Sequence, residues 1–302
     1  MKPPVFDYVA ATSLNMALAA LAEAGGDAKI IAGGQSLMPM LNFRLVRPSL
    51  LVDINPIAEL AFIKEDDGAL RVGALTRHHQ LETSPLVARH LPVVAHAMTH
   101  VAHLAIRNRG TIGGSLSHAD PAAELPMLVM LLDATLHVAS QAGRRTIAAC
   151  DFFLDALNAA LEPDEIVTEI VLPKLPAGTG WGFEEVARRH GDFALAAAAA
   201  TLTVDNGKSG HDSPGDHGGI IGAARIALTG VGPTPLRAEK AEALLIGNAL
   251  TPDLVARASA AVREAVAPET DLHASADYRR HLAGVLAGRA LEAAWRRARG
   301  VA

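Results

Sequence analysis

Two double-glycine turns shape the first half of this chain. Residues 30–44 read IIAGGQSLMPMLNFR, and residues 106–126 read IRNRGTIGGSLSHADPAAELP. In each segment an apolar or basic run leads into two glycines, and a serine and a new apolar run follow. Glycine reaches positive φ without a Cβ penalty, so successive backbone amides at such a turn can point into one concavity. We therefore predict two amide nests, and two nests that face each other would suit a pyrophosphate.

Neither turn carries a standard nucleotide fingerprint. The patterns GxGxxG before a helix and GxxxxGK[ST] are both missing here, so the turns do not support a Rossmann or P-loop site. A single double-glycine turn after a strand is more often only a tight turn. The prediction of phosphate binding therefore depends on the pair. The amides would come from Gly33, Gly34, Gln35 and Ser36 in the first turn, and from Thr111, Gly113, Gly114 and Ser115 in the second.

Composition restricts the class of function. A chain of 302 residues is long enough for two or three domains, and its apolar share of 50% is that of a globular protein. With 27 Lys and Arg against 32 Asp and Glu, it lacks the broad positive charge that nucleic-acid binding requires, so no nucleic-acid partner is expected. The single cysteine, Cys150, cannot hold an iron–sulfur cluster, which takes about four thiolates. It also fits a reducing compartment.

The N-terminal segment MKPPVFDYVAATS lacks the apolar core of a secretory signal. The longest apolar runs are shorter than the roughly eighteen residues of a membrane-spanning helix. We therefore expect a cytoplasmic protein without a membrane span.

Hydrophobic periodicity predicts alternating helices and strands in the first half. A helix over 12–25 and strands over 29–32 and 49–55 outline a small α/β unit. Another helix is expected from Pro92 to about Leu104. The next should start with Asp120 as N-cap and Pro121 as the first helical residue, with Pro126 either kinking it or starting a second helix.

The second half begins after a segment rich in proline and glycine, LPKLPAGTGWG at 172–182, where we place a domain boundary. The alanine run after Gly191 ends in the alternation TLTV, which favours a strand slightly over a helix despite the helix propensity of alanine. AARIALTGVG is the expected returning strand, and 205–219 is the expected exposed loop between the two. Three helices should follow, at 238–246, 252–266 and 276–299.

Three histidines offer a possible metal-ligand stripe. His96, His100 and His103 have the spacing i, i+4 and i+7 on the expected helix. Because no carboxylate or cysteine stands at ligand spacing beside them, a polar helix face is the favoured interpretation. No metal ligand and no catalytic acid, base or nucleophile is predicted on this chain.

At these motifs the sequence resembles the FAD-binding (medium) subunits of the molybdenum hydroxylases, the group of aerobic carbon monoxide dehydrogenase and xanthine dehydrogenase. The resemblance rests on AGGQSLMPMLNFR, IRNRGTIGGSLSHADPAAELP, EEVARRHGDFALAAAAA, LTGVGPTPLRAEKAE and ASADYRRHLAGVLAGRAL, in family order over nearly the whole chain. It implies an α+β fold, with a two-lobed FAD-binding domain of the vanillyl-alcohol-oxidase type at 1–57 and 58–176. A C-terminal α/β domain of the carbon monoxide dehydrogenase flavoprotein type would occupy 177–302.

The resemblance also implies which residues contact FAD. Both glycine turns would cradle the pyrophosphate, which agrees with the amide nests inferred independently. Glu124 matches an acidic flavin contact, and Phe193 falls where some members place a tyrosine over the isoalloxazine, so the ring is kept and the hydroxyl is lost. The expected cofactor-binding residues are Ala32, Gly33, Gly34, Gln35, Ser36, Leu37, Thr111, Gly113, Gly114, Ser115, Glu124, Ile166, Val167 and Phe193.

The implied function is electron transfer within a larger enzyme. In the family, a substrate is hydroxylated at a molybdenum–molybdopterin (or molybdopterin cytosine) cofactor on a large subunit, and electrons pass through [2Fe–2S] clusters on a small subunit to FAD on the medium subunit. The expected assembly is a dimer of heterotrimers. The substrate and the final acceptor (NAD⁺, oxygen or a quinone) stay open. The alternatives are a stand-alone flavin-dependent oxidase or reductase and, less in keeping with the intact glycines, a binding module without flavin.

Overall fold

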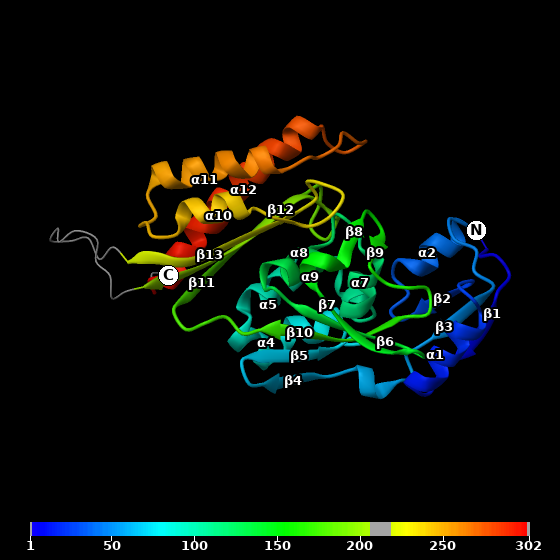
Figure 1. The fold of residues 1–302 in the computed structure, drawn as a ribbon. Helices are drawn as coiled ribbons and strands as arrows, with labels where there is room; N and C mark the ends of the chain where they lie inside the picture. Colours follow the sequence, from blue (N-terminus) through cyan, green and yellow to red (C-terminus); the bar gives the residue numbers. More distant parts are fainter. Residues whose placement is uncertain (1, 206–218, 301–302) are drawn as a thin grey trace.

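The computed structural model describes residues 2–205 and 219–300, so the expected loop at 205–219 lies almost entirely outside the described residues. The described chain forms a three-stranded, a five-stranded and a four-stranded sheet together with a two-stranded ribbon. Figure 1 shows the three-stranded sheet at one end of the molecule, the four-stranded sheet with its helices at the other, and the five-stranded sheet between them. This mixture of parallel and antiparallel sheets with separate helical layers is an α+β architecture.

The first sheet is parallel, with the strand order β1-β3-β2. Ser13 is the N-cap of helix α1, and its hydroxyl accepts a hydrogen bond from the Met16 amide. The helix buries its apolar face against this sheet, as the periodicity predicts. The carboxyl ends of parallel strands meet at one edge, so the residues after β2 and after β3 are brought together. The elements are β1 (Asp7–Ala10), α1 (Leu14–Glu23), β2 (Ala28–Ile31), α2 (Leu37–Asn42) and β3 (Leu50–Asp53).

The second sheet is antiparallel, with the order β4-β5-β10-β6-β7, and short helices bury the largest hydrophobic core against it. Its strands are β4 (Ile63–Asp66), β5 (Ala69–Gly73), β6 (Thr135–Ser140), β7 (Gly143–Ala148) and β10 (Ile166–Pro173). The helices and small elements of this part are η1 (Ala58–Leu60), α3 (His78–Thr83), α4 (Pro85–His90), α5 (Pro92–Met98), α6 (Leu104–Arg107), α7 (Ile112–His118), α8 (Glu124–Leu131), α9 (Ala149–Phe152), β8 (Phe153–Asp155) and β9 (Asn158–Ala159).

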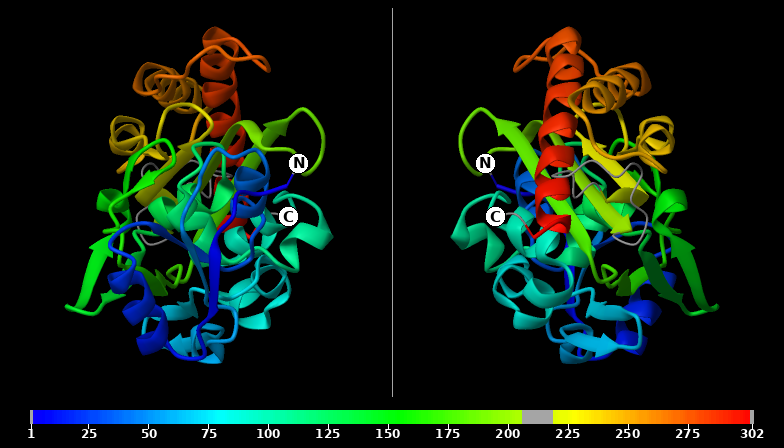
Figure 2. Two further views of the ribbon diagram at one scale, coloured as in Figure 1. Left: turned by 90° about the vertical axis from the view of Figure 1, so that its right-hand side faces the viewer. Right: turned by 90° about the vertical axis from the view of Figure 1, so that its left-hand side faces the viewer.

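The third sheet is antiparallel in the order β11-β12-β13-β14, and the alanine run is its strand β12, as predicted. Residues 196–200 have no exposed surface, because α12 packs along β11 and β12 on one face while α8 contacts β12 and β13. Figure 2 shows α12 running along this sheet. The elements are β11 (Thr179–Ala187), β12 (Ala194–Asp205), β13 (Ile220–Thr229), β14 (Leu236–Arg237), α10 (Glu239–Leu245), α11 (Pro252–Ala265) and α12 (Ala276–Ala298).

Two helix predictions are wrong in their bounds. The helix expected to reach Leu104 ends at Met98, where the Thr99 hydroxyl donates to the His96 carbonyl, so the three histidines do not share one helical face. The helix expected to start at Asp120 starts at Glu124 instead. Asp120 Oδ1 accepts from the Ala122 amide and forms a turn before the helix.

Pro126 is the third residue of α8, where a backbone N–H has no intrahelical acceptor, so it neither kinks the helix nor starts another. The segment between β10 and β11 is residues 174–178, shorter than the expected boundary segment. None of the helices in the described ranges is long and apolar enough to cross a membrane.

Candidate functional site

The first glycine turn forms one wall of a cavity of about 290 Å³ at the carboxyl edge of the first sheet. Residues 32–35 line it together with Met38 and Pro39 from α2, as do Asp53, Asn55 and Arg109. Ala32 to Gln35 were predicted to bind cofactor. Asp53 and Asn55 were not, because only the parallel pairing of β2 with β3 brings the end of β3 to this edge.

The first turn has the properties of an anion-binding nest. Gly34 has a φ of +71°, a conformation that glycine adopts without strain. Within the described part of the chain, the amides of residues 33–36 donate no hydrogen bond to another protein group. Ser36 and Leu37 then begin α2. Four consecutive amides are therefore available to a ligand, as predicted.

Gly33 lies against the second motif. A Cβ at this position would overlap the Arg109 carbonyl oxygen and lie 2.8 Å from the Gly110 Cα. Only glycine permits this approach, so the segment just before the second double glycine forms the neighbouring wall of the same cavity. The two motifs therefore touch, as expected for two walls around one ligand.

The second double glycine is not an amide nest, and that prediction is wrong. Thr111 is the N-cap of α7, and its hydroxyl accepts from the Gly114 amide at 3.1 Å. The amides of Ile112 and Gly113 donate to the carbonyls of Thr76 and Ala74, at 3.0 and 2.9 Å. Ser115 donates its amide to the Thr111 carbonyl. The amides of residues 112–115 are therefore occupied within the protein, and of the four predicted donors only the Thr111 amide has no acceptor among the described residues.

The glycines of the second motif serve close packing instead. A Cβ on Gly113 would lie 2.6 Å from the Ala74 Cβ, so this residue permits α7 to contact the end of β5. His78 packs on the same segment, and burial lowers its pKa to about 4. Its Nε2 lies 3.1 Å from the Thr111 carbonyl, which can only accept, so the neutral ring carries its proton on that nitrogen.

A hydrogen-bond network missed by sequence reasoning joins the two walls. Arg77 donates to the Asn55 Oδ1 at 2.7 Å and to the Arg109 carbonyl. Asn55 Nδ2 in turn donates to the Ala32 carbonyl at 2.7 Å and to the Asp53 carboxylate at 2.6 Å. One arginine therefore fixes the spacing between the first turn and the segment that precedes the second.

Asp53 ends this network as a carboxylate. Partial burial acts to raise its pKa, but hydrogen bonds from Tyr8 and Asn55 and the charge of Arg77 together hold the pKa below its usual range. The Tyr8 hydroxyl donates to Asp53 Oδ2 at 2.6 Å. The carboxylate oxygens thus stabilise the turn. Arg109 is exposed and lines the same cavity, and burial, then the charge of Arg109, lowers the pKa of Arg77, so the Arg109 guanidinium lies near this network.

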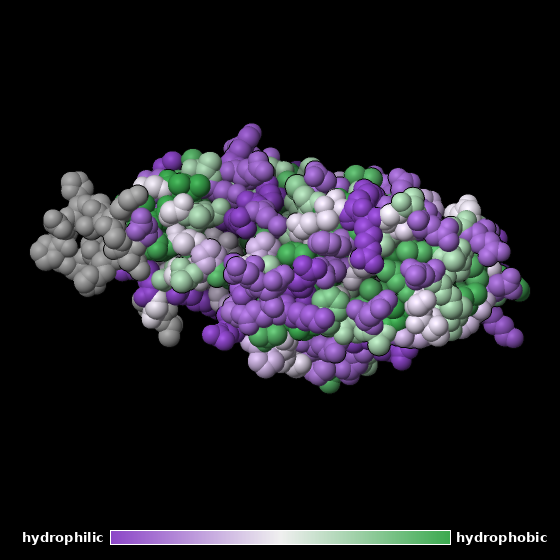
Figure 3. All heavy atoms as spheres, turned by 60° about the horizontal axis from the view of Figure 1, so that its bottom comes forward, coloured by the Kyte–Doolittle hydropathy of each residue, from purple (hydrophilic) through white to green (hydrophobic). Residues whose placement is uncertain are grey.

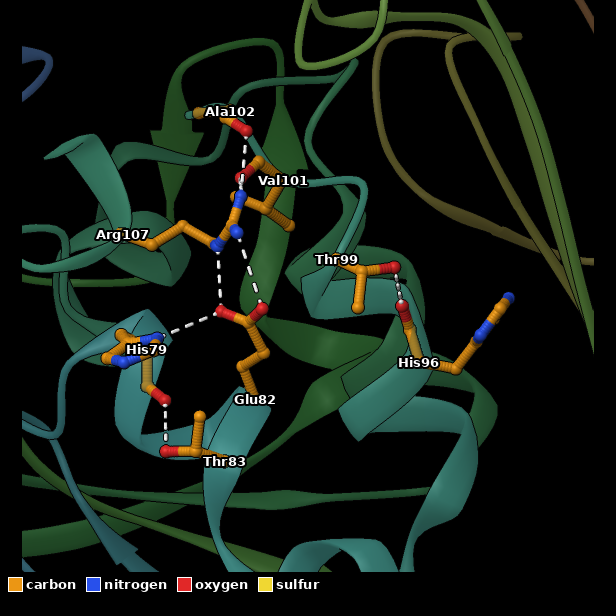
Figure 4. A network of polar contacts seen from close by, with 8 residues as sticks. All are labelled: His79, Glu82, Thr83, His96, Thr99, Val101, Ala102 and Arg107. Carbon is orange, nitrogen blue, oxygen red and sulfur yellow. Dashed lines mark hydrogen bonds and ion pairs between the residues drawn. The ribbon is translucent and has the colours of Figure 1, made fainter. Parts of the chain in front are cut away.

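The basic segment IRNRG divides into two roles. Figure 4 shows Arg107 pointing toward Glu82, with Nε 2.8 Å from Oε2, and donating to the carbonyls of Val101 and Ala102. Ala102 has a φ of +47°, so this anchor holds an unusual backbone conformation in place. Arg107 therefore orders the segment that leads to Arg109, while Arg109 itself lines the cavity.

The remaining predicted contacts lie outside this cavity. Glu124 is the first residue of α8 and is buried, and that burial, followed by the charge of Asp120, raises its pKa to about 7. Ile166 and Val167 begin β10 inside two hydrophobic cores. Phe193 precedes β12 with its side chain 60% exposed. Their contact with a flavin ring stays a prediction.

Free amides and an arginine at the end of a parallel sheet are typical of a site for a ligand that carries phosphate. Comparison with known families identifies the cofactor. The family "FAD binding domain in molybdopterin dehydrogenase" matches residues 4–175, and "CO dehydrogenase flavoprotein C-terminal domain" matches residues 181–294.

Relatives match over nearly their full length. The chain is 44% identical to the 6-hydroxypseudooxynicotine dehydrogenase complex subunit alpha of Paenarthrobacter nicotinovorans, over 99% of this chain and 97% of the relative. It is 41% identical to the caffeine dehydrogenase subunit beta of Pseudomonas sp. strain CBB1, over 96% and 95%. The structure of the Hydrogenophaga pseudoflava carbon monoxide dehydrogenase that lacks the Mo-pyranopterin moiety matches with a TM-score of 0.92 and 42% identity, over 98% of this chain and 99% of that one.

The chain belongs to the FAD-binding medium subunits of the molybdenum hydroxylases, the family that contains the medium chain of carbon monoxide dehydrogenase. The prediction of an FAD-binding domain followed by a carbon monoxide dehydrogenase flavoprotein domain is confirmed. The boundaries 1–57, 58–176 and 177–302 stay proposed boundaries.

Proposed function

We propose that this chain binds FAD and passes electrons from [2Fe–2S] clusters on a small partner subunit to an external acceptor. The substrate would be hydroxylated at the molybdenum cofactor of a large partner subunit. The observation that carries the proposal is the cavity at the first glycine turn, where four unpaired amides and Arg109 meet inside an FAD-binding domain.

The residues present fit the pyrophosphate of FAD. Amide donors that the fold already fixes can bind a diphosphate without a further ordering cost, and Arg109 offsets part of its negative charge. We assign the pyrophosphate to residues 32–37 and Arg109, with residues 111–115 flanking it. Glu124, Ile166–Val167 and Phe193 would border the flavin ring. FAD, when bound, supplies the one- and two-electron chemistry, and the protein supplies binding and orientation.

The substrate is set elsewhere in the complex. Two relatives of similar identity belong to enzymes named for caffeine and for 6-hydroxypseudooxynicotine, and a third chain with the same fold comes from a carbon monoxide dehydrogenase. Such different molecules share no chemistry that one medium chain would recognise. The single cysteine, Cys150, also leaves the iron–sulfur clusters to a partner.

The surface fits a subunit with neighbours. Phe43 and Leu45, just after α2, are 65% and 72% exposed, which supports burial by another polypeptide. Figure 3 shows hydrophobic surface toward the end of the molecule that holds the first sheet and a largely hydrophilic middle. We propose a cytoplasmic dimer of heterotrimers.

Anaerobic reduction tests the electron path. The chain should be purified alone and with its two partner subunits, loaded with FAD, and mixed with the hydroxylase substrate while the flavin absorbance is followed. Bleaching should require both partners. If the isolated chain reduces its flavin with a small substrate and turns over, it is a stand-alone flavin oxidase or reductase. If neither preparation releases FAD on denaturation, the proposal fails.

A further inference from the structure

Two glutamates, the buried Glu124 and the half-buried Glu185, lie where the FAD-binding domain contacts the C-terminal domain. Glu185 on β11 pairs with Ala197 of β12, and Ala197 pairs with Thr229 of β13. Directly paired residues of neighbouring strands point to the same face of a sheet. Glu185 and Thr229 therefore project toward the same side.

That side packs on the start of α8. The Thr229 hydroxyl lies 2.8 Å from the Pro121 carbonyl and 3.0 Å from the Ala123 carbonyl, so the residue before Glu124 is held against the sheet face that carries Glu185. Glu124 is also the charged group that acts on Glu185. Two carboxyl groups from different domains thus share one junction.

Neither carboxyl group has a cation to pair with. In residues 2–205 and 219–300, no Lys, Arg or His forms an ion pair with Glu124 or Glu185. Glu124 is 4% exposed, and the hydrogen bond from its own backbone amide only partly offsets the effect of burial on its pKa. Glu185 Oε2 is buried without a hydrogen-bond partner. A buried carboxylate without a partner is costly, whereas a protonated carboxyl group is not.

The surrounding charges favour the same state. Asp120 adds a further negative charge beside Glu124, and its own neighbour is His118, at 4.0 Å. Two positions before Glu185 on the same strand face, Phe183 packs against the ring of His100, whose pKa burial lowers. Burial, then the charge of Glu124, raises the pKa of Glu185 to about 8.

We propose that Glu124 and Glu185 form a proton-binding site at this junction, in which the pair retains at least one proton at neutral pH. The ligand is a proton taken from water when the two domains pack together. Loss of the last proton leaves two negative charges near each other at this junction and weakens the packing of the two domains. Binding of this proton does not require FAD, and because Glu124 is also one of the residues proposed to border the flavin ring, the site is tested on the apo chain.

The sign of the pH effect follows from the raised pKa values. A carboxyl group that titrates near 4.5 when unfolded and near 7 or 8 when folded adds stability at low pH. This stability is fully present below about pH 4.5 and is lost as the pH rises through about 8. The Tm of the full chain should therefore fall between about pH 6 and pH 9, and it should fall further than the Tm of a chain in which these two carboxyl groups cannot titrate.

Glutamine variants and infrared spectra test the site. Glu185→Gln keeps the shape and removes the titration, so its Tm should fall less than that of the wild type across this range. Glu184→Gln, one residue along and on the opposite strand face, is the matched control and should follow the wild type. The apo full chain should show the carbonyl band of a protonated carboxyl group near pH 7, and this band should weaken in Glu185→Gln and in Glu124→Gln and be missing from the double variant.

Two results overturn the proposal. One is a wild-type infrared spectrum without that band at neutral pH, which needs no variant to fold. The other is a Tm profile of Glu185→Gln parallel to the wild type. Because both measurements use apo chain, failure here leaves the FAD proposal untouched, and failure to bind FAD leaves this site untouched.

Discussion

Gly33→Ala should weaken FAD binding through a single methyl group. The new Cβ would overlap the Arg109 carbonyl oxygen and lie 2.8 Å from the Gly110 Cα. Both are backbone atoms, and they are held in place. The Gly110 amide donates to the Ile106 carbonyl at 2.7 Å, and the His78 amide donates to the Gly110 carbonyl at 2.9 Å. The overlap can only be relieved by moving the two cavity walls apart.

The magnitude follows from the cost of overpacking. One inserted methylene in a close-packed contact costs about 1–3 kcal/mol, and each 1.4 kcal/mol is a tenfold change in a binding constant. If this whole free-energy cost opposes FAD binding, the Kd for FAD rises about 5- to 150-fold. Part of the same cost will lower the Tm.

Titration of apo chain with FAD, followed by the quenching of flavin fluorescence, measures this change. Gly222→Ala on β13 is the matched control, because the nearest atom to its Cβ would be 3.8 Å away and its Kd and Tm should stay at wild-type values. A folded Gly33→Ala chain that binds FAD as tightly as the wild type would refute the assignment of this turn to the pyrophosphate.

Three further outcomes follow from the site. Arg109→Ala should weaken FAD about tenfold but leave the affinity for riboflavin, which lacks phosphate, unchanged; an equal loss for both ligands would contradict a phosphate contact. Gly114→Val should abolish FAD retention during gel filtration, because its Cβ would lie 2.8 Å from the Thr111 hydroxyl that caps α7; retained flavin absorbance would argue against this motif. Arg107→Met should lower the free energy of unfolding in urea by about 1–3 kcal/mol, because Glu82 and two carbonyls lose their donor. Arg257→Ala, which removes an exposed ion pair at 3.8 Å, should cost less than about 1 kcal/mol in the same assay, and similar losses for the two variants would count against the anchor.

The first glycine turn could be predicted because its signal is local. A strand, two glycines and a helix follow one another within residues 28–42, and the structure keeps that order. The second motif has a local signal for the start of a helix and not for an amide nest. Thr111 three residues before Gly114 is an N-cap pattern, and the structure uses it to start α7. The two glycine motifs are similar in sequence but differ in backbone conformation.

Contacts made by strand pairing and by packing between elements could not be predicted from the sequence. Asn55 and Arg77 reach the first turn only because β3 lies parallel to β2 and because Arg77 bridges to the Arg109 carbonyl. Glu124 and Glu185 are brought near each other by the packing of the start of α8 on the third sheet. No periodicity within one segment reports such contacts.

Tertiary contacts also decided two secondary structures. The alanine run has high helix propensity, yet it is a central strand because helices cover both faces of its sheet and leave space only for small side chains. The helix that starts at Pro92 ends at Met98, and beyond it Ala102 has a φ of +47° and Arg107 binds the carbonyls of Val101 and Ala102, a conformation that no helix can continue through. That anchor lies beyond the segment whose periodicity predicted a longer helix.

An experimental structure of the FAD-loaded chain, alone or in its complex, tests the central claim most directly. The pyrophosphate should lie in the cavity at the first turn, within hydrogen-bond distance of the amides of residues 33–36 and beside the Arg109 side chain. FAD bound with its pyrophosphate away from this turn, or amides 33–36 left without a ligand in a loaded protein, would contradict the account.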